Sequence, residues 1–469
     1  MPTRAAPGRV TPAFIRELKR LPGPHKVFDT LEDRLAYAYD GTFETAVPEV
    51  VVKPTTAEQV AATLRFAGEA GVPVVPRGAG TNLSGGAVPL AGGVVLCLMD
   101  MNRILEIRPQ DSLAVVEAGV VTARLHREVE KAGLFYPPDP SSAGVSSIGG
   151  NVAECAGGPR GLKYGVTRDY VLGLQVVLSS GEVIETGGRT VKNVTGYDLP
   201  RLFTGSEGTL GVITRAVLRL LPKPPCRRTI LASFSSLEGA GEAIADVIAS
   251  GIIPTTLEIM DNFTLRAVEE HLGLGLPTWA EASLLIEVDG EAAAVEAQSP
   301  PLRGILERHA AREIQVAADE ARADDLWRAR RAISPAVSRL GPTKISEDAT
   351  VPRSQVPAMI RRLGEIRDKY GLKLVIFGHA GDGNLHPNIA ADQRDAEEMR
   401  RVHLAIDEIF RTCLELGGTL SGEHGIGRRK APYLAWEAGP AGVQVMRGIK
   451  RALDPKAILN PGKIFPDEE

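Results

Sequence analysis

The sequence lacks several features that would place it in a specialised class of protein. Its four cysteines are scattered over 469 residues without a C-x-x-C pair, so neither a disulfide framework nor an iron–sulfur cluster is expected. No run of about 18 apolar residues occurs, which argues against a transmembrane helix. The first 20 residues have no apolar core typical of a signal peptide. We therefore expect a protein of a reducing, cytoplasmic compartment.

An excess of basic residues is also absent. The 54 lysines and arginines against 58 aspartates and glutamates give a net charge of −4. A nucleic-acid-binding protein would show a basic patch or an alkaline domain, and neither is present. The 50 glycines are numerous but follow no fixed period, so collagen-like and low-complexity proteins are excluded.

The glycines concentrate in three loops of the first half. The first loop, PRGAGTNLSGGAVP at 76–89, follows a strand–helix–strand pattern at 50–76, and the others cover 144–165 and 205–214. Backbone N–H groups in such loops can bind phosphate oxygens. The spacing does not match the G-x-G-x-x-G that opens a helix in NAD-binding folds. One such loop is as readily structural, but three favour a large cofactor that carries phosphate.

A proline-rich connector at 221–228 separates this half from a region of different character. Apolar runs near 229–234, 255–260, 283–288, 313–318 and 373–377 predict strands that alternate with helices. This pattern is typical of an α+β domain whose helices cover one face of a sheet.

Histidines and a carboxylate gather in two glycine-rich segments of the second half. His379 and His386 flank GDGNL, which predicts strand–loop–strand, and Glu423 precedes His424 in SGEHGIG. Two histidines and one carboxylate suit Zn²⁺ or a related divalent ion with a coordination position left open. The alternative is that they are hydrogen-bonded structural histidines.

Long strings of the sequence resemble known flavoproteins. PRGAGTNLSGG, SSIGGNVAECAGG, LKYGVTRDYVLGLQVVLSSGE and GSEGTLGVIT are similar to the FAD domain of the vanillyl-alcohol oxidase / p-cresol methylhydroxylase superfamily. GHAGDGNLHPNI, SGEHGIGRRK and LDPKAILNPGKIF resemble one branch of it, which holds the GlcD-type chain of glycolate oxidase, D-lactate dehydrogenases and D-2-hydroxyglutarate dehydrogenases.

The resemblance implies an α+β fold, with a two-lobed FAD-binding domain and an α+β substrate (cap) domain that carries an antiparallel sheet. The implied organisation is an N-terminal helical segment at 1–45, the FAD-binding domain at 46–225, the substrate domain at 226–420, and a segment at 421–469 that returns to the flavin domain. Covalent members often carry a histidine in the pyrophosphate loop. Residues 80–82 contain none, so noncovalent FAD is expected. The residues implied to bind FAD are Pro76, Arg77, Gly78, Ala79, Gly80, Thr81, Asn82, Ser84, Gly85, Gly86, Pro138, Asp139, Ser141, Ser142, Ser147, Gly149, Gly150, Asn151, Gly208, Ile213 and Asn460.

The same branch implies a catalytic site in the second half. The implied metal ligands are His379, His386 and Glu423, the metal being Zn²⁺ by expectation, and His424 is the implied base. The implied substrate-binding residues are Arg330, Ser334, Lys344 and Asn388. Arginine suits a carboxylate because its planar fork binds two oxygens, although Arg330 could equally lie on a solvated helix face. The implied reaction is oxidation of a small 2-hydroxy acid of the glycolate or D-lactate type to the 2-oxo acid, with hydride passing to flavin N5.

Other functions stay open from the sequence. One is a D-2-hydroxyglutarate dehydrogenase, another is a zinc-dependent hydrolase with structural glycine loops, and a third is a noncatalytic subunit that has lost flavin. The electron acceptor also stays open among O₂, a quinone, a partner protein or companion oxidase subunits. A homodimer is one of the assembly states that the sequence allows.

Overall fold

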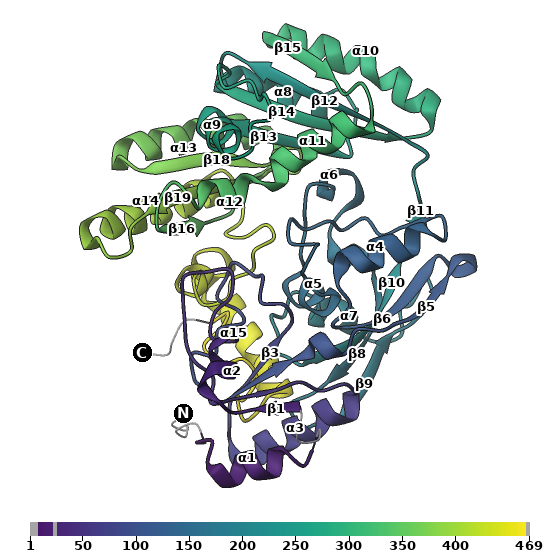
Figure 1. Cartoon of the computed structure of the whole chain (residues 1–469), viewed down its shortest axis with the longest axis vertical. Helices are drawn as coiled ribbons and strands as arrows, with labels where there is room; N and C mark the ends of the chain where they lie inside the picture. Colours follow the sequence, from purple (N-terminus) through teal and green to yellow (C-terminus); the bar gives the residue numbers. More distant parts are fainter. Residues whose placement is uncertain (1–7, 22–25, 466–469) are drawn as a thin grey trace. The chain divides into compact units, whose positions relative to one another are not determined.

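The computed structural model describes residues 8–21 and 26–465, which form two compact units. The first unit combines the described residues up to 156, residues 166–223, and the described residues from 423 onward. The second unit consists of residues 157–165 and 224–422. Figure 1 labels the helices and strands of both units. The first unit is therefore discontinuous in sequence, because the chain leaves it and later returns.

The first sheet of the first unit has four strands in the order β1-β2-β4-β3. They are β1 Val27–Phe28, β2 Val50–Val52, β3 Val74–Arg77 and β4 Val94–Cys97. Strands β2 and β3 both pair with β4 in parallel, and helix α3 (Ala57–Ala70) connects them. The Thr56 hydroxyl accepts a hydrogen bond from the Gln59 amide at 3.3 Å, and Gly71 ends the helix with φ 66°. The predicted strand–helix–strand at 50–76 is confirmed.

The second sheet of the first unit is antiparallel, with five strands in the order β5-β6-β10-β8-β9. They are β5 Ile104–Arg108, β6 Leu113–Glu117, β8 Val171–Val177, β9 Val183–Gly187 and β10 Val212–Arg219. The two sheets are the two lobes that the resemblance implied for an FAD-binding domain.

Helices and a small ribbon complete the first unit. They are α1 Pro12–Leu18, α2 Leu31–Leu35, α4 Thr122–Glu130, α5 Ile148–Glu154, α7 Leu199–Phe203, α15 Leu434–Leu453, and the paired strands β7 Leu134–Phe135 and β11 Leu221–Pro222. Helix α15 bends at Gly439, whose φ and ψ are 64° and 165°. After this helix the chain returns to the first sheet, where Leu459 forms a parallel bridge with Val74.

The second unit is built on one large sheet with the order β15-β12-β14-β13-β18-β19-β16, and β17 also pairs with β19. Its strands are β12 Cys226–Phe234, β13 Thr256–Asp261, β14 Ala282–Gly290, β15 Ala311–Val316, β16 Thr343–Ser346, β17 Ala349–Thr350, β18 Lys373–His379 and β19 Asn384–Ala391. All of these pairings are antiparallel, as the resemblance implied.

Helices pack on both faces of this sheet, so the prediction of one covered face was wrong (Figure 1). The unit's helices are α6 Gly161–Tyr164, α8 Leu237–Ala249, α9 Asn262–Leu272, α10 Ala292–Arg308, α11 Glu320–Arg331, α12 Ile333–Val337, α13 Val356–Tyr370 and α14 Ala396–Glu415. Val375 and Phe377 of β18 share an apolar core with α9, α11 and α12. Their neighbours Leu374 and Ile376 point the other way and are also buried, and β18 contacts α13 as well. Strands covered on both sides show continuous apolar runs rather than alternation.

The two predicted ligand histidines lie at a strand–loop–strand turn, as expected. His379 ends β18, residues 380–383 form the loop, and β19 begins at Asn384. Gly383 has φ 92°, and a Cβ atom there would lie 2.1 Å from the carbonyl oxygen of Val351. Glycine is therefore required at this position by both conformation and space.

Candidate flavin and substrate sites

The predicted pyrophosphate loop follows β3 and is packed tightly against the start of α5. A Cβ atom on Gly78 would lie 2.3 Å from Oγ of Ser147. Ser147 itself caps α5, accepting a hydrogen bond from the Gly150 amide at 3.3 Å. A side chain at position 78 would therefore force the two glycine-rich segments apart. Their close approach explains why glycine stands in the loop.

The remaining predicted flavin residues also belong to the first unit. Gly208 has φ 68°, and its Cβ would meet the Pro76 ring at 3.2 Å. The Asn151 side chain donates to the Thr122 hydroxyl at 2.8 Å. The segment with Pro138, Asp139, Ser141 and Ser142 runs between β7 and α5, and Ile213 lies in β10. Residues predicted from four separate segments thus fall into one unit.

The polar atoms of this region fit a bound cofactor. Ser84 Oγ, Asn82 Oδ1 and Asn460 Oδ1 are buried, yet within the described residues they have no hydrogen-bond partner. Buried polar atoms are almost always satisfied in folded proteins. A ligand rich in oxygen and nitrogen, such as FAD, would supply the partners that the protein does not. The donor set is therefore compatible with the cofactor.

Arg77 lies across its own loop. Its Nη1 donates to the Tyr39 carbonyl at 2.7 Å, and its guanidinium carbon lies 5.7 Å from the centre of the Tyr37 ring. A Cβ on Gly80 would meet the guanidinium at 2.1 Å. Burial lowers the pKa of Arg77, but an arginine stays charged in proteins. This cation is thus held at the predicted phosphate site.

A pair of buried glutamates lies beside the loop. Burial raises the pKa of Glu154 well above its usual value, and the neighbouring Glu207 raises it further. Burial likewise raises the pKa of Glu207, although that carboxylate accepts hydrogen bonds from the amides of Ile426 and Gly427, both at 2.8 Å. The Asn82 side chain donates to Glu154 at 3.2 Å. Sequence reasoning missed both acids.

In the second unit, most of the predicted site residues share one face of the sheet. His386 pairs with Phe377, and Asn388 pairs with both Val375 and Ser346. Because side chains alternate along a strand, His386 and Asn388 point to the same side as Phe377. Lys344 is opposite Ala390 and therefore also on this side. The register thus gathers residues that lie far apart in the sequence.

Glu258 of β13 connects two of the predicted residues and was itself not predicted. Its side chain is fully buried, and it accepts a hydrogen bond from Arg330 Nε at 2.6 Å. Its other oxygen lies 2.7 Å from His379 Nδ1. Burial would raise the pKa of Glu258, but the adjacent Arg330 and His379 outweigh this effect and hold the pKa below its usual value. The signal in the sequence was a lone acid within the apolar run TTLEIM.

Arg330 does not lie on a solvated helix face. Its side chain is 6% exposed at the end of α11, and its guanidinium carbon lies 5.2 Å from the centre of the Phe377 ring. Because Nε donates to Glu258, the two Nη groups form the part of the fork that can face a ligand. The buried arginine is suited to bind a carboxylate.

Two other predicted substrate residues contact each other. Lys344 Nζ donates a hydrogen bond to Ser334 Oγ of α12. Burial lowers the pKa of Lys344. Asn388 is buried on the same face of the sheet as Lys344. All four predicted substrate residues therefore belong to the second unit.

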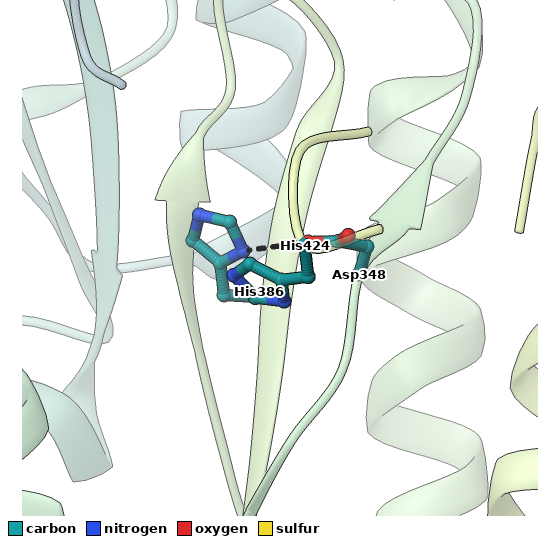
Figure 2. A group of neighbouring side chains, drawn as sticks. All are labelled: Asp348, His386 and His424. Carbon is teal, nitrogen blue, oxygen red and sulfur yellow. Dashed lines mark ion pairs between the residues drawn. The ribbon is translucent and has the colours of Figure 1, made fainter. Parts of the chain in front are cut away.

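Two groups of side chains have the composition and proximity needed to hold a metal ion. His379, His386 and Glu423 form the predicted group, and Asp348, His386 and His424 form another; in each, the ligand atoms lie within 4.8 Å of one another. Figure 2 shows the second group, in which His386 Nδ1 lies 3.3 Å from Asp348 Oδ1. Asp348, which also accepts a hydrogen bond from Ser421 at 2.8 Å, was not predicted. Nitrogen and carboxylate ligands in this number suit Zn²⁺.

The fold and these sites define a flavin-binding protein with a separate unit that can hold a metal and a carboxylate. Residues 48–187 match the family described as "FAD binding domain", and residues 223–464 match "FAD linked oxidases, C-terminal domain". The chain belongs to the FAD-linked oxidases, and it is a flavoprotein oxidoreductase.

Curated relatives and solved structures agree. The chain is 48% identical to the glycolate oxidase chain GlcD of Bacillus subtilis, with 97% of each chain covered. It is 34% identical to D-lactate dehydrogenase of Anaerostipes hadrus, covering 97% of this chain and 98% of that one. It is 36% identical to D-2-hydroxyglutarate dehydrogenase of Stutzerimonas stutzeri, covering 97% and 99%. The structure of p-cresol methylhydroxylase shares the fold, with a TM-score of 0.81 at 20% identity over 98% of each chain.

Two further observations bear on the cellular setting. Within the described residues, no helix is both long and apolar enough to cross a membrane. All four cysteines lie in the described part of the chain, and none forms a disulfide.

Proposed function

We propose that this protein oxidises a small 2-hydroxy acid, of the glycolate or D-lactate type, to the 2-oxo acid. The observation that carries the proposal is the pairing of Arg330 and His379 through Glu258. It places a carboxylate-binding cation and a predicted metal ligand on the same buried carboxylate, as recognition of a 2-hydroxy acid requires. Relatives named for glycolate oxidase and D-lactate dehydrogenase support the same substrate class.

The chain's own residues would divide the work. The Nη groups of Arg330 would bind the substrate carboxylate, with Asn388 and Ser334 as further polar contacts. His424 would take the proton of the substrate hydroxyl as general base. FAD, when bound, supplies the acceptor for the C2 hydride. The residues of 76–86, 138–142, 147–151, Gly208, Ile213 and Asn460 would hold it.

A divalent metal, for which Zn²⁺ is the expected ion, fits His379, His386 and Glu423. Such an ion acts as a Lewis acid toward a hydroxyl oxygen. The Nδ1 atom of each histidine faces a buried carboxylate, Glu258 or Asp348. The Nε2 atoms are therefore the ones suited to a metal. This pattern is common around protein metal sites.

Lys344 supports a short substrate. A 2-hydroxy diacid such as D-2-hydroxyglutarate would need a second cation for its distal carboxylate. Lys344 is a cation on this face of the sheet, but it donates to Ser334. We therefore expect glycolate and D-lactate to be preferred over D-2-hydroxyglutarate.

The decisive experiment is anaerobic bleaching of the purified yellow protein by glycolate, D-lactate, L-lactate and D-2-hydroxyglutarate. We expect glycolate and D-lactate to bleach the flavin fastest. Bleaching by D-2-hydroxyglutarate alone would replace the substrate assignment, and bleaching by none would contradict the proposed function. A protein that stays colourless after incubation with FAD would instead favour the zinc hydrolase.

We also propose that FAD is bound without a covalent link, because the loop at 80–82 offers no histidine. Acid precipitation should release the flavin into the supernatant. Flavin that remains in the pellet would contradict this proposal.

We further propose that electrons leave the flavin to a partner protein or to companion oxidase subunits. The Bacillus subtilis relative is named as a subunit, which supports the proposal. Reduced flavin in the isolated chain should then reoxidise slowly in air. Rapid reoxidation by O₂ would contradict it.

A further inference from the structure

Glu258 is a fully buried carboxylate of the second unit that belongs to none of the predicted ligand or substrate sets. It lies in β13 with 0% of its side chain exposed, and its strand neighbours Leu257 and Ile259 are buried and apolar. An ionised carboxylate in such surroundings is costly unless it is paired and hydrogen-bonded. Apolar side chains of similar size often replace a buried ion pair without loss of stability. Stability alone therefore does not account for a glutamate here.

The geometry around Glu258 restricts two side chains at once. One oxygen accepts from Arg330 Nε at 2.6 Å, and the other lies 2.7 Å from His379 Nδ1. A carboxylate only accepts hydrogen bonds, so His379 must carry its proton on Nδ1. The lone pair of this ring then resides on Nε2. The guanidinium of Arg330 is likewise fixed through Nε, which directs its two Nη groups away from Glu258.

We infer that Glu258 is a positioning residue: it sets the tautomer of His379 for metal binding and the orientation of Arg330 for the substrate carboxylate. This inference rests on the proposed function and adds a residue to it. The His379 ring also meets the His386 ring edge-on, with centroids 4.9 Å apart. Fixing one ring therefore helps to fix the other. Metal affinity and carboxylate affinity should depend on the same side chain.

The test is Glu258→Gln, which keeps the shape and removes one acceptor. The Gln oxygen can accept from Arg330 or from His379, but its NH₂ group must face the other. Facing His379, it would require a lone pair on Nδ1 and so place the proton on Nε2. Facing Arg330, it would oppose two donors. Loss of such an outer partner typically weakens metal binding by about 10–100-fold.

We would measure Zn²⁺ affinity by chelator competition and the KM for the bleaching substrate, in the FAD-loaded full chain. Glu258→Gln should weaken Zn²⁺ binding about 10–100-fold and raise KM, while the flavin stays bound. The matched control is Asp261→Asn, a buried carboxylate three positions along the same strand. Asp261 accepts hydrogen bonds from Thr264 and from the Ile376 amide. A role limited to packing predicts that both variants lose thermal stability and that neither changes Zn²⁺ affinity.

If Glu258→Gln does not fold, the double variant Glu258→Gln/Arg330→Gln carries the same test, because it leaves no unpaired buried charge. Its Zn²⁺ affinity should still fall. Native-like Zn²⁺ affinity in whichever variant folds would overturn the inference. Native protein that binds no Zn²⁺ would contradict the proposed metal site itself, and the inference with it, so the two failures are distinguishable.

Discussion

The side-chain amide of Asn460 donates a hydrogen bond of 2.9 Å to the carbonyl oxygen of Gly86, 374 positions earlier in the chain. The same nitrogen donates to the carbonyl of Glu207 at 2.8 Å. Asn460 is 2% exposed and has φ 41°, a conformation that asparagine tolerates better than most residues. One side chain thus joins the C-terminal segment to two glycine-rich loops.

Asn460→Ala should weaken FAD binding and lower the melting temperature. The substitution leaves two buried carbonyls without their donor, at a cost of about 1–3 kcal/mol each. Flavin release can be followed by fluorescence during thermal unfolding. Asn102→Ala is the control, because Asn102 is exposed and donates only to the nearby Met99 carbonyl. Equal effects of the two substitutions would contradict the assignment of Asn460 to the flavin site.

His424→Ala should slow flavin reduction about 10²–10⁴-fold, the usual contribution of a general base. The FAD content should not change, because the predicted flavin residues lie elsewhere. Anaerobic stopped-flow absorbance gives the rate. His403→Ala, at an exposed position of α14, should reduce at the native rate. Near-native reduction in His424→Ala would remove this histidine from the mechanism.

His386→Ala should lose both metal and activity while the protein stays yellow. His386 belongs to both groups of potential ligands, so its loss cannot be compensated by a shift from one group to the other. Elemental analysis of untagged protein and the flavin absorbance are the two measurements. Treatment of the native protein with a chelator should have the same effect. An active native enzyme without stoichiometric divalent metal would show that these histidines instead bind the substrate directly.

The buried glutamate pair predicts a pH dependence of stability in the first unit. The pKa values of Glu154 and Glu207 are raised in the folded state. Groups of this kind stabilise the fold fully below their unfolded pKa, near 4.5. This contribution is lost as the pH rises through the raised folded value. The melting temperature should therefore fall as the pH is raised above this range.

Glu154→Gln should reduce that fall, because an amide cannot ionise and its oxygen can still accept from Asn82. Melting temperatures measured across the pH range test this. Glu128→Gln is the control, since Glu128 is exposed and paired with Lys131. The groups that face Glu154 are Glu207, Asp40, Asn82 and Lys463. An unchanged pH dependence in Glu154→Gln would place its origin in another member of this cluster.

The parts that could be predicted from the sequence are those with a local signal. The loop at 76–89 and the turn between His379 and His386 are marked by glycines that their backbone and surroundings require. Capping residues such as Thr56 and Gly71 marked the ends of a helix. In each case the physical cause lies within a few residues of its effect.

The parts that could not be predicted depend on strand pairing. Glu258 and Asp348 are single acids in short segments, and their meaning appears only when β13, β18 and β19 are aligned. The burial of Arg330 also needed the sheet, because its partner is 72 positions away. Helix α10 was missed because it contains Pro300 and Pro301, which normally argue against a helix interior.

The bridge between Val74 and Leu459 has a consequence for how the protein is made. The first sheet begins with residues near the N-terminus, yet one edge receives its neighbour only from residues synthesised after the whole second unit. The nascent flavin unit must therefore wait, incomplete, while residues 224–422 leave the ribosome. Tight capture of the cofactor is then an event that follows synthesis, and a chain that stops before Leu459 would lose it even though every glycine-rich loop had been translated.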